Sequence, residues 1–98
     1  MKNKIGQLVV VRCYYAGVWV GTLNAIDTET NKVELTNAHR LWSWTAKDGF
    51  SLSEVANNGV KGGKISKPVE SVWLNNNDCY EVASMKSEAY ETVKELSK

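Results

Sequence analysis

The chain has 98 residues, a formal net charge of +1 and 43% hydrophobic residues, which suits one soluble domain with a modest core. Its longest apolar run, residues 8–11, is far below the roughly 20 residues that a bilayer-spanning helix needs, and the N-terminus lacks the apolar region of a secretory signal. The small net charge disfavours duplex DNA or an anionic membrane as partner, so we expect a cytoplasmic protein in which any anion-binding surface is local.

The first third of the sequence predicts a three-stranded meander. Residues 7–15 and 17–25 are rich in valine and aromatic residues on either side of the Ala16-Gly17 break, which is typical of a β-hairpin. Within the second strand, even positions 18–22 would face opposite to odd positions 19–23. A polar turn at 27–31 leads into a third strand over 32–36.

The middle of the chain predicts a short helix followed by a loop. Ser51 and Glu54 have the spacing of a capping box, and Gly59 can end the helix in the left-handed conformation, so we expect a helix over 52–58. Residues 60–64 contain two glycines and two lysines and are expected to form a flexible basic loop.

The last third predicts a second hairpin and a C-terminal helix. Two strands, 69–74 and 79–82, flank an asparagine-rich turn at 75–78. An apolar stripe at helical spacing then indicates an amphipathic helix over 84–97, capped near Ser84 or Ser87. The stripe consists of Met85, Ala89, Val93 and Leu96.

Together these elements predict one α+β domain, residues 1–98, that is mostly β. Residues 1–83 would form a small SH3-like barrel or bent antiparallel sheet of about five strands with one short inserted helix, and residues 84–97 would form the C-terminal helix. Four tryptophans, four tyrosines and an amphipathic last helix exceed what so small a core readily hides, which favours a homo-oligomer.

The sequence offers little for metal binding or catalysis. Cys13 and Cys79 lie in predicted strands without a Cys-x-x-Cys pair, and we interpret both as small buried residues kept reduced in cytosol, with a disulfide or reactive thiol as the alternative. The single histidine has no nucleophile partner visible in sequence. We therefore expect a protein that is not an enzyme and that uses neither a metal nor a cofactor.

The stretch TNAHRLWSW, residues 36–44, concentrates one arginine, the only histidine and two tryptophans. If this chain is extended, Arg40, Trp42 and Trp44 share one face of a strand. A guanidinium can hold a phosphate, and an indole offers a flat surface to a base, so the stretch favours a nucleotide-type site. Core packing of either indole is the alternative, and His39 is expected to be a hydrogen-bonded spacer.

The glycine- and lysine-rich segment is a second candidate. Gly62 and Gly63 can turn consecutive amide N–H groups toward an anion, and Lys61 and Lys64 supply positive charge. The Walker spacing is absent, so the segment is a weak signal, and a solvated loop with incidental lysines is the alternative.

Three segments, RCYYAGVWVGTL (12–23), ELTNAHRLWSW (34–44) and SLSEVANNGVKGGKIS (51–66), resemble a family of small, largely uncharacterised phage and prophage proteins. His39 stands where that family commonly has arginine, and Gly63-Lys64 replaces its usual Gly-Ser pair. The resemblance does not include the C-terminal helix, from about Ser84.

The resemblance implies an accessory phage protein in the cytoplasm of a bacterial host. Some such proteins are counter-defence sponges, so we expect a protein that sequesters a nucleotide-derived small molecule, either a cyclic nucleotide or an ADP-ribose-type immune signal. The alternatives are a protein-binding inhibitor of a host defence or replication enzyme and a single-stranded nucleic-acid-binding small barrel. The candidate ligand-binding residues are Arg40, Trp42, Trp44, Lys61, Gly62, Gly63 and Lys64, with Arg12, Tyr14, Tyr15, Trp19 and His39 completing the site.

Overall fold

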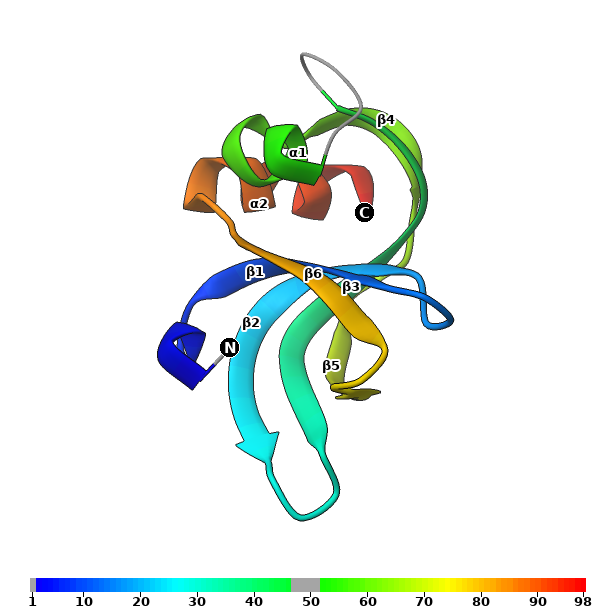
Figure 1. The fold of residues 1–98 in the computed structure, drawn as a ribbon. Coiled ribbons are helices and arrows are strands. Elements are labelled where there is room, and N and C mark those ends of the chain that lie inside the picture. Colours follow the sequence, from blue (N-terminus) through cyan, green and yellow to red (C-terminus); the bar gives the residue numbers. More distant parts are fainter. Residues whose placement is uncertain (1, 47–51) are drawn as a thin grey trace.

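The computed structural model describes residues 2–46 and 52–98 of the chain. In this part a short 3-10 turn precedes six strands and two α-helices (Figure 1). The elements in chain order are η1 (Lys2–Lys4), β1 (Leu8–Cys13), β2 (Val18–Asp27), β3 (Lys32–Ala46), α1 (Leu52–Asn58), β4 (Val60–Ile65), β5 (Val69–Asn75), β6 (Cys79–Ser84) and α2 (Ser87–Leu96). The predicted class, a mostly-β α+β domain with a bent antiparallel sheet and two helices, is confirmed.

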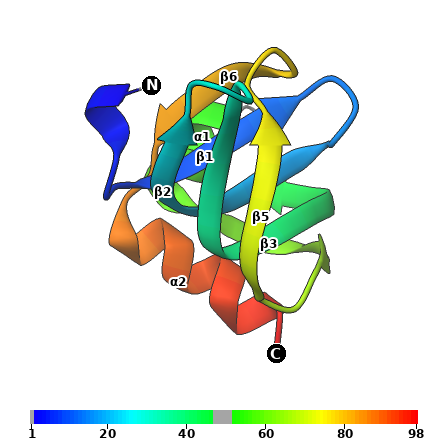
Figure 2. The same ribbon diagram turned by 90° about the horizontal axis from the view of Figure 1, so that it is seen from below.

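All strand pairs in the sheet are antiparallel, in the order β4-β3-β2-β1-β6, and β5 also pairs with β3. Strand β3 has 15 residues, so its first half pairs with β5 and its second half with β4. Figure 2 shows β5 beside β3, on the side away from β2. The sequence predicted only residues 32–36 of this strand, and the extension to residue 46 carries the TNAHRLWSW stretch.

The sheet curls because β2 and β3 bend at facing positions. A Cβ at Gly21 would lie 3.0 Å from Thr36 O and 3.1 Å from Ala38 Cα, so glycine allows the two backbones to approach closely here. The register shifts between Val20 and Thr22. On β3, Asn37 has a φ of 48°, in the left-handed region. The predicted simple alternation of faces along residues 18–23 is therefore interrupted at the bend.

Two apolar clusters lie on opposite faces of β1. Val9 and Val11 point into the interior of the curled sheet, whereas Val10 faces the helices, and all three side chains are fully buried. Figure 1 shows α1 and α2 stacked over β1 and β6, while β2, β3 and β5 curl away on the other side. Each buried valine contributes about 1.5–3 kcal/mol relative to an exposed one, so both layers stabilise the central strand.

The segment predicted as a basic loop is strand β4, and that prediction is wrong. Helix α1 reverses the chain, and residues 60–65 then return along the second half of β3. Val60 is buried in the helix-side cluster and Ile65 packs against it, which holds the strand in place despite its two glycines. Gly59 has a φ of 84°, as expected for the end of α1. Ser51, the predicted capping residue, lies outside the described residues.

Helix α2 packs its apolar stripe on the sheet, with differences from the prediction at both ends. Ala89 and Val93 are buried, but Leu96 is 40% exposed. The helix begins at Ser87 after Lys86, which caps it without a side-chain hydrogen bond, so the predicted serine cap is wrong. Instead, the Lys86 amide donates to the last turn of α1, which fixes the entry of the helix.

Candidate functional site

A bulge at Trp42 interrupts β3 between Arg40 and Trp44. Leu41 and Ser43 pair with consecutive residues of β4, which leaves Trp42 as the extra residue. One extra residue interrupts the alternation of faces along a strand. Trp44 therefore packs, like Leu41, on the helix-side core, and the prediction that Arg40, Trp42 and Trp44 share one face opposite to Leu41 is wrong.

Arg40 instead covers an aromatic ring beside the loop between β1 and β2. Its guanidinium carbon lies 6.0 Å from the centroid of Trp19, whose indole N–H donates to Ala16 O at 2.9 Å. A Cβ at Gly17 would lie 3.0 Å from Arg40 Nη2, so the guanidinium fits closely against the loop. Arg40 Nε is buried and has no hydrogen-bond partner among the described residues. The cation–π contact, about 0.5–2 kcal/mol, stabilises this loop.

Trp42 lies in a groove between β3, β4 and the end of α2. The groove, called here the Trp42 groove, encloses about 630 Å³ and is lined by Trp42, Gly63, Lys64, Ile65 and Leu96. The Trp42 side chain is 58% exposed, whereas Trp44 is half-buried against the core. The groove therefore combines an accessible indole, an apolar wall and one ammonium group.

Positive charge runs along β4 and the connection to β5. Lys61, Lys64 and Lys67 are all exposed, and the ion pairs among the described residues involve Arg12, Lys94 and Lys98 instead. The predicted anion nest does not form, because the glycines pair with β3 and the Lys64 amide donates to Ser43 Oγ at 3.2 Å. Any anion bound here would be held by lysine side chains.

Three tyrosines form a second aromatic surface, the tyrosine cluster, at the β1–β2 loop. Tyr14 is 74% exposed, Tyr15 is 92% exposed, and the ring of Tyr80 on β6 lies 4.5 Å from that of Tyr14. The Asp78 carboxylate accepts hydrogen bonds from the amides of Tyr15, at 2.9 Å, and Ala16, at 3.0 Å. These bonds hold the loop against the turn between β5 and β6.

Arg12 is adjacent in the chain to this loop, but its charge is compensated. Its guanidinium lies 3.8 Å from Glu81, in an ion pair whose side chains are 36% and 48% exposed. Exposed pairs of this kind contribute about 0–1 kcal/mol. Most of the predicted site residues thus fall into two groups. Arg12, the tyrosine cluster, Trp19 and Arg40 surround the β1–β2 loop, and Trp42 with Gly63 and Lys64 forms the groove.

His39 is buried at a third position. Its side chain is 2% exposed, its Nδ1 lies 3.0 Å from Ser66 O, and its ring meets the edge of Tyr90 at 5.8 Å. With Nδ1 as donor to this carbonyl, Nε2 is left as an acceptor. The hydrogen bond expected of His39 is present, and its predicted place in a ligand-binding site stays a prediction.

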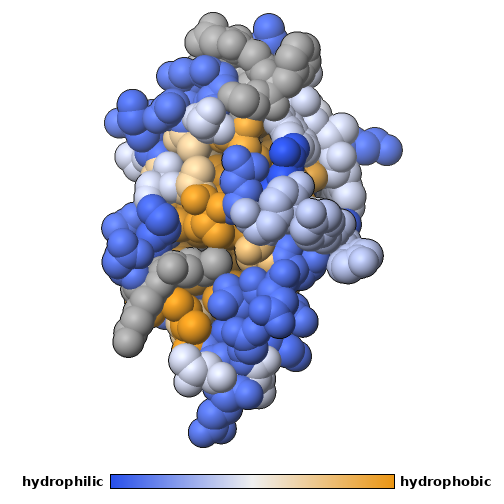
Figure 3. Space-filling model, viewed as in Figure 1, coloured by the Kyte–Doolittle hydropathy of each residue, from blue (hydrophilic) through white to orange (hydrophobic). Residues whose placement is uncertain are grey.

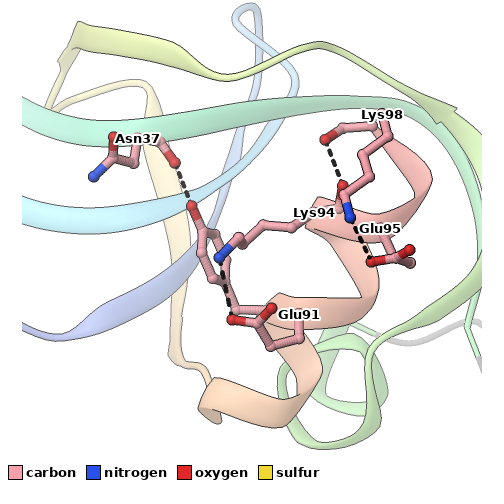
Figure 4. Close-up of polar contacts among 7 residues, drawn as sticks. Asn37, Glu91, Lys94, Glu95 and Lys98 are labelled. Carbon is pink, nitrogen blue, oxygen red and sulfur yellow. Dashed lines mark hydrogen bonds and ion pairs between the residues drawn. The ribbon is translucent and has the colours of Figure 1, made fainter.

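A second hollow, of about 550 Å³, lies over His39 beside α2. It is lined by Asn37, His39, Lys67, Pro68, Tyr90, Lys94, Ser97 and Lys98. Figure 4 shows that Lys94 is paired with Glu91 and Lys98 with Glu95. Each nitrogen–oxygen distance is 3.2 Å. Burial and the neighbouring Glu91 raise the pKa of Tyr90, whose hydroxyl donates to Asn37 O at 2.6 Å. Lys67 also lines this hollow and has no ion pair among the described residues, so the hollow carries a local positive charge.

The sequence did not identify several residues that complete these surfaces. Leu96 and Ile65 form the wall of the groove, and Tyr80 stacks on Tyr14. In the sequence these residues are visible only as members of an apolar or aromatic pattern. Such a pattern does not distinguish a core residue from one at the rim of a groove. The predicted role of each ligand-binding residue stays a prediction.

Two further classes of site are absent from the described residues. No group of three or more histidine, cysteine, aspartate or glutamate side chains in residues 2–46 and 52–98 is placed to hold a metal ion. None of the helices in this same part has the length and apolar character of a bilayer span.

Figure 3 shows apolar surface as a band bordered by hydrophilic side chains.

Comparison with solved structures places the fold among Sm-like proteins. The P. aerophilum SmAP1 heptamer is 13% identical, with 88% of each chain covered and a TM-score of 0.55. A heptameric archaeal Sm protein, described for its implications for the eukaryotic snRNP core, is 12% identical, covers 87% of this chain and 94% of its own, and has a TM-score of 0.55. At these identities the likeness shows the fold alone. No curated protein matches the chain.

The sequence itself matches an uncharacterised family over most of its length. The model of the family described as "Domain of unknown function (DUF6948)" matches residues 6–93, which include most of α2 as well as the segments noted above. The phage origin that those segments suggested stays a prediction. The chain belongs to the DUF6948 family.

Proposed function

We propose that this protein is a non-enzymatic binding module whose ligand is single-stranded nucleic acid, held at the Trp42 groove. The observation that supports this most directly is the 58% exposed indole of Trp42 in a groove with Lys64. Stacking of a base on an aromatic side chain contributes about 1–3 kcal/mol and tolerates any sequence, because every base has a flat face.

The lysines of β4 and of the connection to β5 supply the second half of such a site. Lys61, Lys64 and Lys67 have no carboxylate partner among the described residues, so each can neutralise a phosphate without first breaking an ion pair. The net charge of +1 makes this attraction local rather than general. A structural neighbour described in connection with the snRNP core adds support at the level of the fold.

The size of the groove favours a second candidate, a nucleotide-derived small molecule. A volume of about 630 Å³ lies within the usual range of roughly 300–1,000 Å³ for small-molecule pockets. In this alternative Trp42 stacks on the base of a cyclic nucleotide or ADP-ribose-type signal, and the protein acts as a counter-defence sponge in the bacterial cytoplasm. Trp44, which packs on the helix-side core, would not contact the ligand.

Fluorescence anisotropy with labelled single-stranded oligonucleotides tests the first candidate. Trp42→Ala should weaken binding on the order of tenfold or more, because it removes the stacking surface. Trp73→Ala is the matched control, since Trp73 is a 47% exposed indole on β5, outside the groove. Equal losses in the two variants, or no binding by the native protein, would contradict the proposal.

Lysine substitutions and small ligands separate the two candidates. For a single strand, Lys64→Ala should lower the dependence of log affinity on log salt by about 0.7, and Lys86→Ala should leave that slope unchanged. Calorimetric titration with cyclic oligonucleotides and cyclic ADP-ribose isomers should give saturable heat only if the protein is a sponge. Saturation by one of these, lost in Trp42→Ala and without oligonucleotide binding, would select the second candidate.

We also propose that the chain forms a homo-oligomer. Both solved neighbours are described as heptamers. In the described part of this chain, β4 and β6 each pair with one strand, so they end the sheet and present backbone groups to a further strand.

A further inference from the structure

Two thiols that are 66 residues apart in the sequence meet between β1 and β6. Cys13 and Cys79 occupy partner positions in this antiparallel pair, just after a register shift between Arg12 and Cys13. Their sulfur atoms are 3.6 Å apart, and both cysteines are reduced. The sequence placed them in two strands but could not show that the strands are neighbours.

We propose that Cys13 and Cys79 are an oxidisable pair that a low-molecular-weight disulfide converts into an intramolecular cross-strand disulfide. A disulfide bond is about 2.05 Å long, so the two sulfur atoms must approach by about 1.5 Å. Rotation of the two side chains can supply this movement, because the backbones already lie side by side. This inference does not depend on the Trp42 groove and goes beyond the proposed function.

The two sulfur atoms differ in access and in acidity, which assigns their roles. Cys79 is half-buried, whereas Cys13 is buried. The hydrogen bond from Cys13 lowers the pKa of Cys79, while that same bond and burial raise the pKa of Cys13. The thiolate is the reacting form of cysteine, so Cys79 attacks the oxidant and Cys13 reacts second.

Glutathione disulfide serves as the oxidant and accepts both electrons. The Cys79 thiolate attacks one sulfur of the glutathione disulfide, which breaks that bond, releases one glutathione thiolate and leaves a mixed disulfide on Cys79. Cys13 then loses its proton to solvent, and its thiolate attacks the Cys79 sulfur and releases the second glutathione. The two cysteines lose two electrons, and one glutathione disulfide gains them.

The new bond would lie at the base of the tyrosine cluster. Asp78 precedes Cys79 and accepts the amides of Tyr15 and Ala16 through its carboxylate, while its own carbonyl accepts the amide of Tyr14 at 3.1 Å. A covalent link between Cys13 and Cys79 would therefore tie the β1–β2 loop to the turn between β5 and β6. Oxidation should restrict the motion of the exposed tyrosines.

Oxidation of dilute, full-length protein with glutathione disulfide tests the proposal. After unfolding and alkylation, intact mass should show a monomer that has lost two hydrogen atoms and carries no alkyl group, and dithiothreitol should restore two alkylation sites. The oxidised protein should also unfold at a higher urea concentration than the reduced one, because the link constrains the unfolded chain.

Single substitutions distinguish the two sulfur atoms. Cys13→Ser should stop at the mixed disulfide on Cys79, whereas Cys79→Ser should react with glutathione disulfide more slowly, since only the buried thiol remains. Three results with the native-sequence protein after glutathione disulfide treatment would overturn the proposal. These are covalent dimers, a doubly glutathionylated chain, and two thiols that still react with the alkylating agent. If either variant fails to fold, the native-sequence protein alone still shows whether the intramolecular disulfide forms.

Discussion

Trp42 and Trp44 are two positions apart in the chain, yet the structure gives them different environments. Trp42 is 58% exposed in its groove, and Trp44 packs on the helix-side core. Arg40 is again different, because it lies on the ring of Trp19 with a buried Nε that has no partner in the described part of the chain. The bulge at Trp42 therefore decides which of the two indoles is accessible to a ligand.

Gly59 is a residue whose substitution should destabilise the fold. Its φ of 84° disfavours any side chain, and a Cβ there would overlap Thr92 Oγ1 and lie 2.9 Å from Ala89 O. We expect Gly59→Ala to lower the free energy of unfolding by on the order of 1–3 kcal/mol, as measured by urea denaturation.

Gly62→Ala is the matched control for this substitution. A Cβ at Gly62 would meet nothing within 4 Å, so the variant should differ from the native protein by less than about 0.5 kcal/mol. Equal unfolding free energies for the two variants would show that the turn between α1 and β4 does not require glycine.

For the strands, Glu34 joins side chains of three elements on the outer face of the sheet. It accepts hydrogen bonds from Ser71 of β5 and from Asn24 of β2, the latter at 2.8 Å. The bond from Ser71, followed by that from Asn24, lowers the pKa of Glu34 below its ordinary value of 4.5. The folded state thus favours the carboxylate form.

This pKa shift predicts an acid-dependent contribution to stability. Because the unfolded chain takes up the proton more readily, the contribution of Glu34 is complete above its unfolded pKa near 4.5 and is lost as the pH falls through the lower folded pKa. Urea midpoints measured from neutral pH to about pH 3 should therefore converge between native protein and Glu34→Gln.

Glu70, a carboxylate on β5, provides the control for this measurement. Glu70→Gln removes one negative charge without removing the bonds to Ser71 and Asn24. A difference between native protein and Glu34→Gln that stays constant over the same pH range would show that these bonds do not favour the carboxylate.

At the scale of the whole molecule, the open ends of the sheet predict assembly. The mass from multi-angle light scattering should be a whole-number multiple, two or more, of the 10.9 kDa mass of one chain. Tyr80→Lys places a charge on the edge strand β6 and should shift the mass toward the monomer. Tyr15→Lys makes the same change in a loop and is the matched control. A monomeric native protein at every concentration would contradict the assembly.

The sequence by itself determined the elements that depend on local pattern. The valine-rich first hairpin, the helix over 52–58 with Gly59 after it, and the burial of Ala89 and Val93 in the last helix follow from side-chain periodicity and backbone preference. Neighbouring residues set these preferences among themselves. The division into a mostly-β body and a C-terminal helix follows for the same reason.

Only the tertiary structure decided what the candidate site is. The glycine-rich segment 60–65 is a strand because distant apolar residues hold it against β3, and the bulge at Trp42 exists only in the pairing of those two strands. Leu96 joins Trp42, and Cys13 joins Cys79, through contacts across more than 50 positions of the chain. Such contacts are set by the packing of whole elements, and local periodicity carries no record of them.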